Sequence, residues 1–277
     1  MKKWIVMLAA ALALLLIGCQ AEEPAGTASV PPEPSPTAGV PVSTPPETPS
    51  PEQLLAQQPI DDSHDAFLVD TGGKLGTLLV TAEQGEQDAK PWFFQTTLSV
   101  WNPQNMGAPM QSMTVLVDEL AFGRHDALDA NFDGYMDFGY MYVIGNQPNY
   151  WYLWVWDEEA GQFVEVPEYR EISGPRCNPE TGIIDGFARS SGAGDGTTTF
   201  HRWEDGELVC VRRIETWWEA TDMVIPETEG TVFIYGIRVE DRIDGELTQV
   251  YYKEFPPGED FFDEQAKWEH LDYHGEE

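Results

Sequence analysis

Basic residues are scarce in this 277-residue sequence, which has 15 lysines and arginines against 48 aspartates and glutamates, a formal net charge of −33. Proteins that bind nucleic acids need basic surfaces to neutralise phosphates, and attraction to anionic lipid headgroups needs basic clusters. The composition therefore excludes nucleic acid as a partner and disfavours electrostatic membrane binding. It leaves cations and basic proteins as the plausible partners, although most of the acids simply keep an exported domain soluble.

Cysteine is also scarce, with three residues in all. Beyond the N-terminal region only Cys177 and Cys210 remain. An exported protein can oxidise such a pair, but spacing alone does not fix pairing, so a disulfide and two free thiols both stay open.

Catalytic motifs are missing as well. The five histidines have no HExxH or other zinc spacing, and the sequence has no G-x-S-x-G nucleophile elbow. The glycine-rich run of residues 189–196 lacks the Lys-Ser/Thr ending of a phosphate loop. Adjacent acids such as Glu158/Glu159 and Glu204/Asp205 could serve glycoside hydrolysis only if they faced each other across a cleft, and on a turn they point into water. We therefore predict that the protein is not an enzyme.

The N-terminus has the form of a processing signal. Lys2 and Lys3 precede an apolar run, Trp4–Ile17, that is shorter than a comfortable membrane span. The run ends in Leu16-Ile17-Gly18-Cys19, the lipobox pattern of bacterial lipoproteins. We predict that residues 1–18 are cleaved and that Cys19 carries a lipid on the extracytoplasmic face of a bacterial membrane. An ordinary secretory signal with an incidental cysteine is the alternative.

A linker follows the lipidated cysteine. Eleven of the 40 residues from 20 to 59 are proline, and the segment contains no aromatic residue. Proline removes backbone donors and favours extended polyproline structure, and the apolar surface is too small to offset the entropy of folding. Residues 19–59 are thus predicted to be a disordered tether, with Leu54 and Leu55 as the start of a short helix. Without the signal peptide, which has two lysines and no acid, the net charge becomes −35.

Residues 60–277 are predicted to form one all-β domain, because runs rich in aromatic and β-branched residues alternate with turn signals and no helical period is sustained. Nine of the ten tryptophans lie in this domain. The predicted strands are 93–101, 113–120, 136–144, 150–156, 200–203, 207–216, 231–240 and 247–255.

Three acidic hairpins of this domain resemble one another. Each passes from an apolar strand end through acids to a glycine, and these glycines are Gly161, Gly206 and Gly245. Asp-Gly turns favour tight hairpins, and spacings of 45 and 39 residues are close to the length of a propeller blade. We predict a β-propeller-like fold of about five small blades, with an irregular sandwich or barrel as the alternative.

The most specific pattern in the chain is Asp129-Ala-Asn131-Phe-Asp133-Gly134-Tyr135-Met-Asp137. Oxygen side chains at alternate positions can surround one calcium ion, which takes six to eight oxygen ligands. The predicted ligands are the side chains of Asp129, Asn131, Asp133 and Asp137 and the carbonyl of Tyr135. Asp126 or Glu119 could complete the shell, and a metal-free Asx-rich turn is the alternative.

This loop differs from an EF-hand. The twelfth position, where an EF-hand has glutamate, is Tyr140, and the flanking residues 113–120 and 136–144 have strand character. The pattern therefore predicts a strand-loop-strand calcium site.

The loop, together with Tyr150-Trp-Tyr-Leu-Trp154 and Phe163-Val-Glu-Val-Pro, resembles the calcium-binding β-propeller immunity lipoproteins of bacterial type IV secretion. The similarity is best over residues 113–165 and continues weakly to about 214. It implies calcium-ligand roles for Asp129, Asn131, Asp133 and Asp137, and it implies inhibition of lysozyme-like effectors. The inhibitory loop of that family matches no segment of this chain.

Together these observations predict a monomeric, non-enzymatic lipoprotein of the cell envelope that binds calcium and inhibits a basic peptidoglycan hydrolase. A carbohydrate- or peptidoglycan-binding surface domain is the second candidate, and a cell-wall hydrolase is the third. Trp151, Trp154 and Trp156 are expected to share one strand face, packed in the core rather than exposed as a sugar-binding platform.

Overall fold

The computed structural model describes residues 48–145, 149–190, 194–221 and 232–275. The predicted signal peptide 1–18, the predicted lipidation site Cys19 and the predicted linker up to residue 47 lie outside these ranges, so these features remain predictions. Glu47–Glu277 form one compact unit. None of the described helices is long and apolar enough to span a bilayer.

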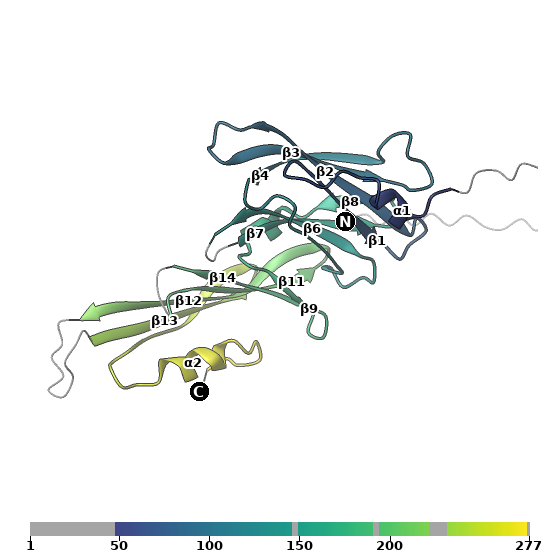
Figure 1. Cartoon of the computed structure of the whole chain (residues 1–277). Helices are drawn as coiled ribbons and strands as arrows, with labels where there is room; N and C mark the ends of the chain where they lie inside the picture. Colours follow the sequence, from purple (N-terminus) through teal and green to yellow (C-terminus); the bar gives the residue numbers. More distant parts are fainter. Residues whose placement is uncertain (1–47, 146–148, 191–193, 222–231, 276–277) are drawn as a thin grey trace, which may run out of the picture. The chain divides into compact units, whose positions relative to one another are not determined.

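Three antiparallel sheets make up this unit (Figure 1). The first sheet is formed by β1 (His64–Asp70), β2 (Thr77–Gln87), β3 (Phe93–Trp101) and β4 (Gln111–Asp118). The second is formed by β5 (His125–Leu128), β6 (Asp137–Ile144), β7 (Asn149–Asp157) and β8 (Gln162–Glu165). The third is formed by β9 (Arg176–Asn178), β10 (Ile183–Arg189), β11 (Gly196–Glu204), β12 (Glu207–Thr221), β13 (Val232–Ile243) and β14 (Glu246–Phe255).

Every sheet is a meander, because strands that follow one another in sequence are also neighbours in space. The predicted all-β fold is thus confirmed. Two four-stranded sheets have the strand number of propeller blades. The third sheet has six strands, and within the described ranges the sheets number three and all remain open. The expected count of about five blades is therefore not seen, because β9 to β14 pair without interruption where the sequence suggested separate blades.

Alternation along the strands follows the burial of one face. In β3, Thr96, Leu98 and Val100 are buried, whereas Gln95 and Thr97 are exposed. This pattern has the period of two that a half-buried strand requires, and the predicted strand 93–101 coincides with β3.

The Asp-Gly hairpins form as predicted. Asp205 and Gly206 have φ values of 51° and 86°, and Asp244 and Gly245 have values of 51° and 90°. Each pair forms a two-residue loop, between β11 and β12 or between β13 and β14. Positive φ at both central positions is the geometry of the type I′ turn, which matches the twist of the paired strands.

The cores lie between the sheets. Phe67 and Leu78 of the first sheet pack with Phe138 and Trp154 of the second, where the latter two rings stack at 5.0 Å. A smaller cluster joins the second and third sheets and includes Leu153 of β7 and Ile184 of β10.

Two helices complete the unit. Helix α1 (Pro51–Leu55) starts at Ser50, whose side chain forms a capping box with Gln53. Its Leu54 is buried against Ala66 and Leu79. A short helix therefore exists here, but Leu54 and Leu55 end it, whereas the sequence suggested that they begin it. The folded unit therefore includes residues that the sequence assigned to the linker.

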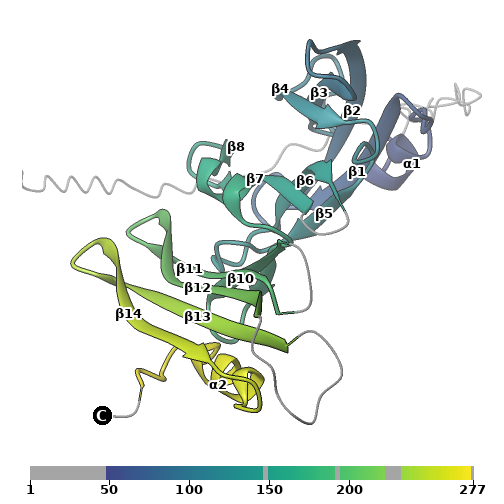
Figure 2. The same cartoon turned by 90° about the vertical axis from the view of Figure 1, so that its left-hand side faces the viewer.

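Helix α2 (Phe261–Trp268) was not expected from the sequence. It covers one face of the six-stranded sheet (Figure 2). Phe261 and Trp268 are both buried there, against a cluster that includes Ile214, Ile237 and Val239. A short 3₁₀ turn, η1 (Pro167–Glu171), connects the second sheet to the third.

Candidate functional site

The predicted calcium loop lies between two strands, as the sequence indicated. It connects the end of β5 at Leu128 to the start of β6 at Asp137. The upstream strand is β5, rather than the run 113–120 that the sequence suggested. Residue Phe132 has φ of 60° and Gly134 of 91°, so the chain turns sharply twice within the loop.

Side-chain oxygens organise this loop. The Asp129 carboxylate accepts hydrogen bonds from the N–H groups of Asp133 and Gly134, both at 3.0 Å. The Asn131 amide donates to Asp133 at 2.8 Å, and Asp133 also accepts the N–H of Tyr135 at 2.9 Å. These bonds bring Asp129, Asn131 and Asp133 to the same side of one tight turn.

Asp137 has a different role. Its side chain is fully buried, and its two carboxylate oxygens accept the N–H groups of Ala130 and Trp156, each at 2.8 Å. The pKa of this carboxyl is raised to about 7, mainly by burial and also by the charge of Asp133, while the two N–H donors act against the rise. Asp137 thus ties the loop to β7.

The loop also contacts the third sheet. The Trp203 indole on β11 donates to the Ala130 carbonyl at 2.8 Å. Ala130 is itself buried in the cluster between the second and third sheets. A distortion of the loop would therefore disturb the packing of both the second and the third sheet.

Calcium fits the donor chemistry of the loop in part. Asp129, Asn131 and Asp133 offer hard oxygen donors, and each carboxylate oxygen that accepts one N–H keeps a further lone pair. The raised pKa of Asp137 is due mainly to burial, and the negative charge of Asp133 adds to it. Asp137 is fully buried, whereas the side chains of Asp129, Asn131 and Asp133 are half-buried or exposed, so these three are the better candidates for direct ligands.

The loop is not a fully assembled metal shell. In the part of the chain that the structure describes, no three His, Cys, Asp or Glu side chains gather as a ready metal site. Asp126 and Glu119, the suggested additional ligands, are both exposed, on β5 and in the turn after β4. Full coordination would require water or further loop carbonyls, and the Tyr135 carbonyl remains a predicted ligand.

The tryptophans of β7 are core residues. Trp154 and Trp156 are 1% and 2% exposed, which agrees with the predicted packing role. Trp151 lies three residues before Trp154 and therefore points to the other face, where its ring covers Gly139. The expectation that all three rings share one face was wrong, because a strand alternates with a period of two.

Cys177 of β9 and Cys210 of β12 are both free thiols. Burial raises the pKa of Cys177 to about 11, and it also raises the pKa of Cys210. At Cys210 burial outweighs the nearby charges of Arg213 and Arg242, so neither thiol has the lowered pKa of a reactive cysteine.

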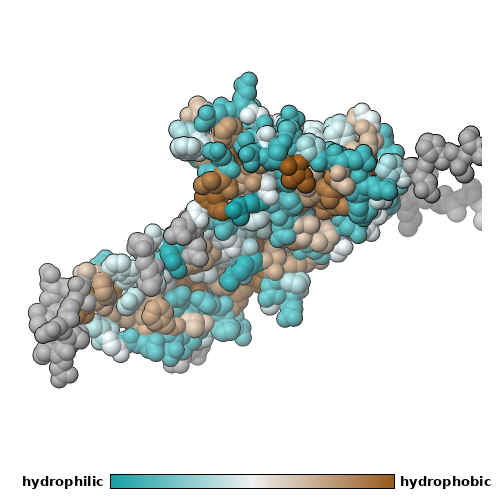
Figure 3. Space-filling model, viewed as in Figure 1, coloured by the Kyte–Doolittle hydropathy of each residue, from teal (hydrophilic) through white to brown (hydrophobic). Residues whose placement is uncertain are grey.

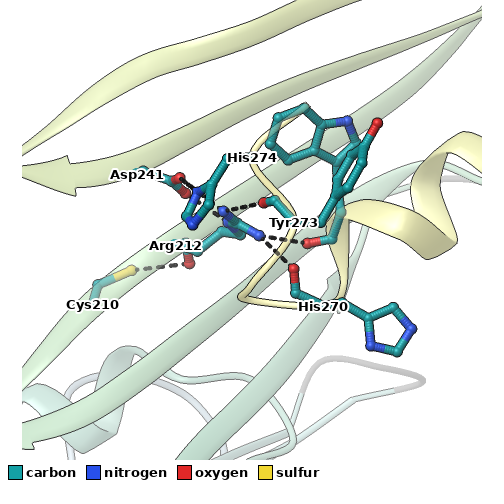
Figure 4. Close-up of polar contacts among 7 residues, drawn as sticks. Cys210, Arg212, Asp241, His270, Tyr273 and His274 are labelled. Atoms are coloured by element: carbon teal, nitrogen blue, oxygen red, sulfur yellow. Dashed lines mark hydrogen bonds and ion pairs between the residues drawn. The ribbon is translucent and has the colours of Figure 1, made fainter. Parts of the chain in front are cut away.

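A buried arginine is the main structural feature that sequence reasoning missed. Arg212 of β12 is 1% exposed, and it forms a two-point ion pair with Asp241 of β13, with distances of 2.6 and 2.7 Å. Its remaining N–H groups donate to the carbonyls of Trp268, His270 and Tyr273 at 3.1, 2.8 and 3.0 Å (Figure 4).

We call this group the Arg212 clamp. It satisfies all five N–H donors of the guanidinium, and it holds the end of α2 and the following turn against the six-stranded sheet. A lone arginine in a strand pattern gives no local sequence signal for such a role. His274 also approaches Asp241, at 3.9 Å.

Comparison with known proteins does not identify the chain. No protein-family model matches it, and neither curated proteins nor solved structures show a significant similarity.

Proposed function

We propose that this protein is a non-enzymatic lipoprotein of the bacterial cell envelope that binds and blocks a basic peptidoglycan hydrolase. The observation that carries the proposal is the large acid excess that the fold leaves uncompensated. The resemblance around the calcium loop supports it, and so do the lipobox and the long predicted tether.

Most of the positive charge of the fold, nine of the 13 lysine and arginine side chains after residue 47, is already paired internally. Nine lysine and arginine side chains lie within 3.8 Å of a carboxylate. Each pair uses one acid, whereas the chain has 48. Hydrophilic residues are spread over the described part of the face shown in Figure 3, interrupted by apolar patches. Such a surface would attract a basic protein and increase its rate of association.

Peptidoglycan hydrolases suit this surface because their substrate is anionic and many of them are basic. Charge gives encounter rather than a stable complex, so inhibition requires a segment that enters the catalytic cleft. The adjacent acids noted above are poor catalytic pairs. Glu158 accepts the Trp156 indole N–H at 2.9 Å, and Glu204 pairs with Arg202 at 2.7 Å.

Within this proposal, calcium has a structural role. Asp129, Asn131 and Asp133 would hold the ion, and the ion would neutralise carboxylates that lie at the junction of the second and third sheets. The three meanders would serve as blades of a propeller-like array, with β9 to β14 as one enlarged blade. The lipid on Cys19 would hold the monomer at the extracytoplasmic membrane surface.

The test is a titration of soluble fragment 47–277 against purified muramidases and amidases, with cell-wall lysis followed at low and high salt. Stoichiometric inhibition of one enzyme that persists at high salt supports the proposal. An unrelated protein of similar negative charge is the control, because nonspecific pairing weakens as salt screens the charges. Weak inhibition of every basic enzyme, lost at high salt, contradicts the proposal.

The second candidate function is that of a carbohydrate- or peptidoglycan-binding surface domain. A pocket beside helix α2 favours it, and the properties of that pocket carry the inference that follows.

A further inference from the structure

A pocket of about 700 Å³ lies between helix α2 and the sheet face formed by β10 and β11. Small-molecule sites typically have volumes of about 300 to 1,000 Å³, so this one is large enough for a ligand. The sheet contributes Asp185, Phe187, Thr198 and Phe200, and the helical side contributes Gln265, Glu269 and His270.

One polar group in the pocket wall is buried and has no partner. Ser173 is 4% exposed, and its hydroxyl has no hydrogen-bond partner. This hydroxyl is shielded from the open part of the pocket, so it does not contact a ligand there directly. Ser173 lines the pocket together with Asn149, which brings an amide to the same wall.

Charge in the pocket is close to balanced. Arg176 donates to Asp185 at 2.9 Å, so this carboxylate is already neutralised. Glu269 accepts a hydrogen bond from Gln265 at 3.2 Å. Two carboxylates thus face one guanidinium, which disfavours phosphate and other strongly anionic ligands.

Apolar surface is present beside these polar groups. Phe187 and Phe200 line the sheet side, and Phe200 is 8% exposed. The combination of aromatic rings with closely spaced carboxylates, amides and hydroxyls matches a ligand that carries many hydroxyls and no net charge. A sugar ring has this chemistry, since its C–H faces pack on aromatic side chains and its hydroxyls both donate and accept.

The helical wall is held in place by the Arg212 clamp. Arg212 binds the backbone carbonyls of Trp268 and His270. The side chain of His270 remains available to line the pocket. Gln265 and Glu269 lie on the same helical segment, so the clamp fixes the whole wall before a ligand arrives.

We propose that the pocket between α2 and β10–β11 binds a short neutral saccharide. Asp185, Gln265 and Glu269 contact the sugar hydroxyls, and Arg212 acts as a positioning residue. This site is independent of hydrolase inhibition, so it can exist whether or not the proposed function holds.

The experiment uses the full chain in a zwitterionic detergent that contains no sugar. Isothermal titration with cellotriose, maltotriose and N,N′,N″-triacetylchitotriose measures binding, and phosphate and spermidine serve as charged probes. We expect saturable binding of at least one saccharide and none of the charged probes. Saturation by a charged probe alone, or failure of all three saccharides to bind, overturns the proposal.

Variants locate the site. Gln265→Ala is expected to weaken saccharide binding about tenfold, the typical effect of a lost hydrogen bond in a pocket. Asp263→Asn, on an exposed position of the same helix, should leave binding unchanged. Glu269→Gln keeps the shape of its side chain and provides a second test should Gln265→Ala unfold, as thermal melting would show. Unchanged affinity in the folded Gln265→Ala or Glu269→Gln variant places the ligand elsewhere and overturns the assignment.

Discussion

The guanidinium of Arg212 shows how one side chain can decide whether two segments pack. A buried arginine is costly to desolvate, and it is tolerated here because a carboxylate and three carbonyls receive its five N–H groups. Lysine has three donors on a flexible stem and cannot reproduce this fork. The clamp therefore depends on the shape of arginine as well as on its charge.

Replacing Arg212 with Met is expected to lower the free energy of unfolding by about 3 to 5 kcal/mol, because Asp241 and three carbonyls lose their partner. Arg212→Lys should recover only part of this loss. Arg213→Lys is the matched control. Arg213 is the next residue, it is 45% exposed, and its pair with Glu240 at 3.3 Å is a surface pair. Urea denaturation of the three variants and of wild type measures their free energies of unfolding. Equal stability of Arg212→Met and wild type would show that the clamp does not stabilise the fold.

His201 predicts a pH dependence of stability. Burial lowers its pKa from 6.5 to about 4, and its Nδ1 atom has no partner. The unfolded chain therefore binds the proton more tightly, so the stability due to neutral His201 is present above pH 6.5 and is lost as the pH falls towards 4. Wild type should lose about 2 to 3 kcal/mol more than His201→Gln between pH 7 and pH 4.5. Parallel stability curves for the two proteins, measured by urea denaturation, would contradict this prediction.

At the scale of elements, the calcium loop is the part that the sequence described best. The spacing of oxygen side chains predicted a loop between strands, and the structure has it from β5 to β6. The role of Asp137 was not visible in the sequence, because its partners Ala130 and Trp156 are set by the fold. A pattern of alternating acids in the sequence cannot distinguish a metal ligand from a buried carboxylate that accepts backbone N–H groups.

Some elements of secondary structure could be predicted from the local sequence, and others could not. Strand β3 and the Asp-Gly turns follow from local chemistry, namely alternation in the strand and positive φ at the turns. Helix α2 has only eight residues and is stabilised by the burial of Phe261 and Trp268 against the sheet. The union of β9 to β14 into one sheet likewise depends on distant pairing. Helix α2 cannot be derived from a local pattern, because short helices owe their stability to tertiary packing. The six-stranded sheet cannot be derived either, because strand pairing is set by the whole fold.

Removal of calcium is expected to destabilise the fold through this loop. Two carboxylates and the buried Asp137 lie close together, and a cation that binds only the folded state at 100 times its Kd adds about 2.7 kcal/mol. Chelator should therefore lower the melting temperature, and Asp133→Ala should abolish the response to calcium. Glu180→Ala, in the exposed turn after β9, controls for the loss of one acid. Identical melting curves with calcium and with chelator would identify the loop as a metal-free turn.

At the scale of the whole molecule, the acid excess and the predicted anchor must be considered together. Without the predicted signal peptide the net charge of −35 repels anionic membrane surfaces, so the protein cannot rely on lipid headgroups for attachment. A lipid on Cys19 would supply that attachment, and a linker rich in proline would let the domain stand away from the surface that repels it. The same arrangement would present the pocket and the acidic surface to soluble partners.

Lipidation at Cys19 is testable by cell fractionation. Wild type is expected in the membrane fraction as a cleaved product, since one acyl chain binds only marginally and the diacylglyceryl group adds two. Cys19→Ser removes the thiol that accepts the lipid, so the protein should become soluble or accumulate as uncleaved precursor. Cys177→Ser is the matched control, because that thiol is free and lies within the folded unit. Its fractionation should match wild type. A Cys19→Ser product of mature length that stays in the membrane fraction would show that something other than this lipid holds the protein there, and the acid excess makes a direct attraction to headgroups the least suitable explanation.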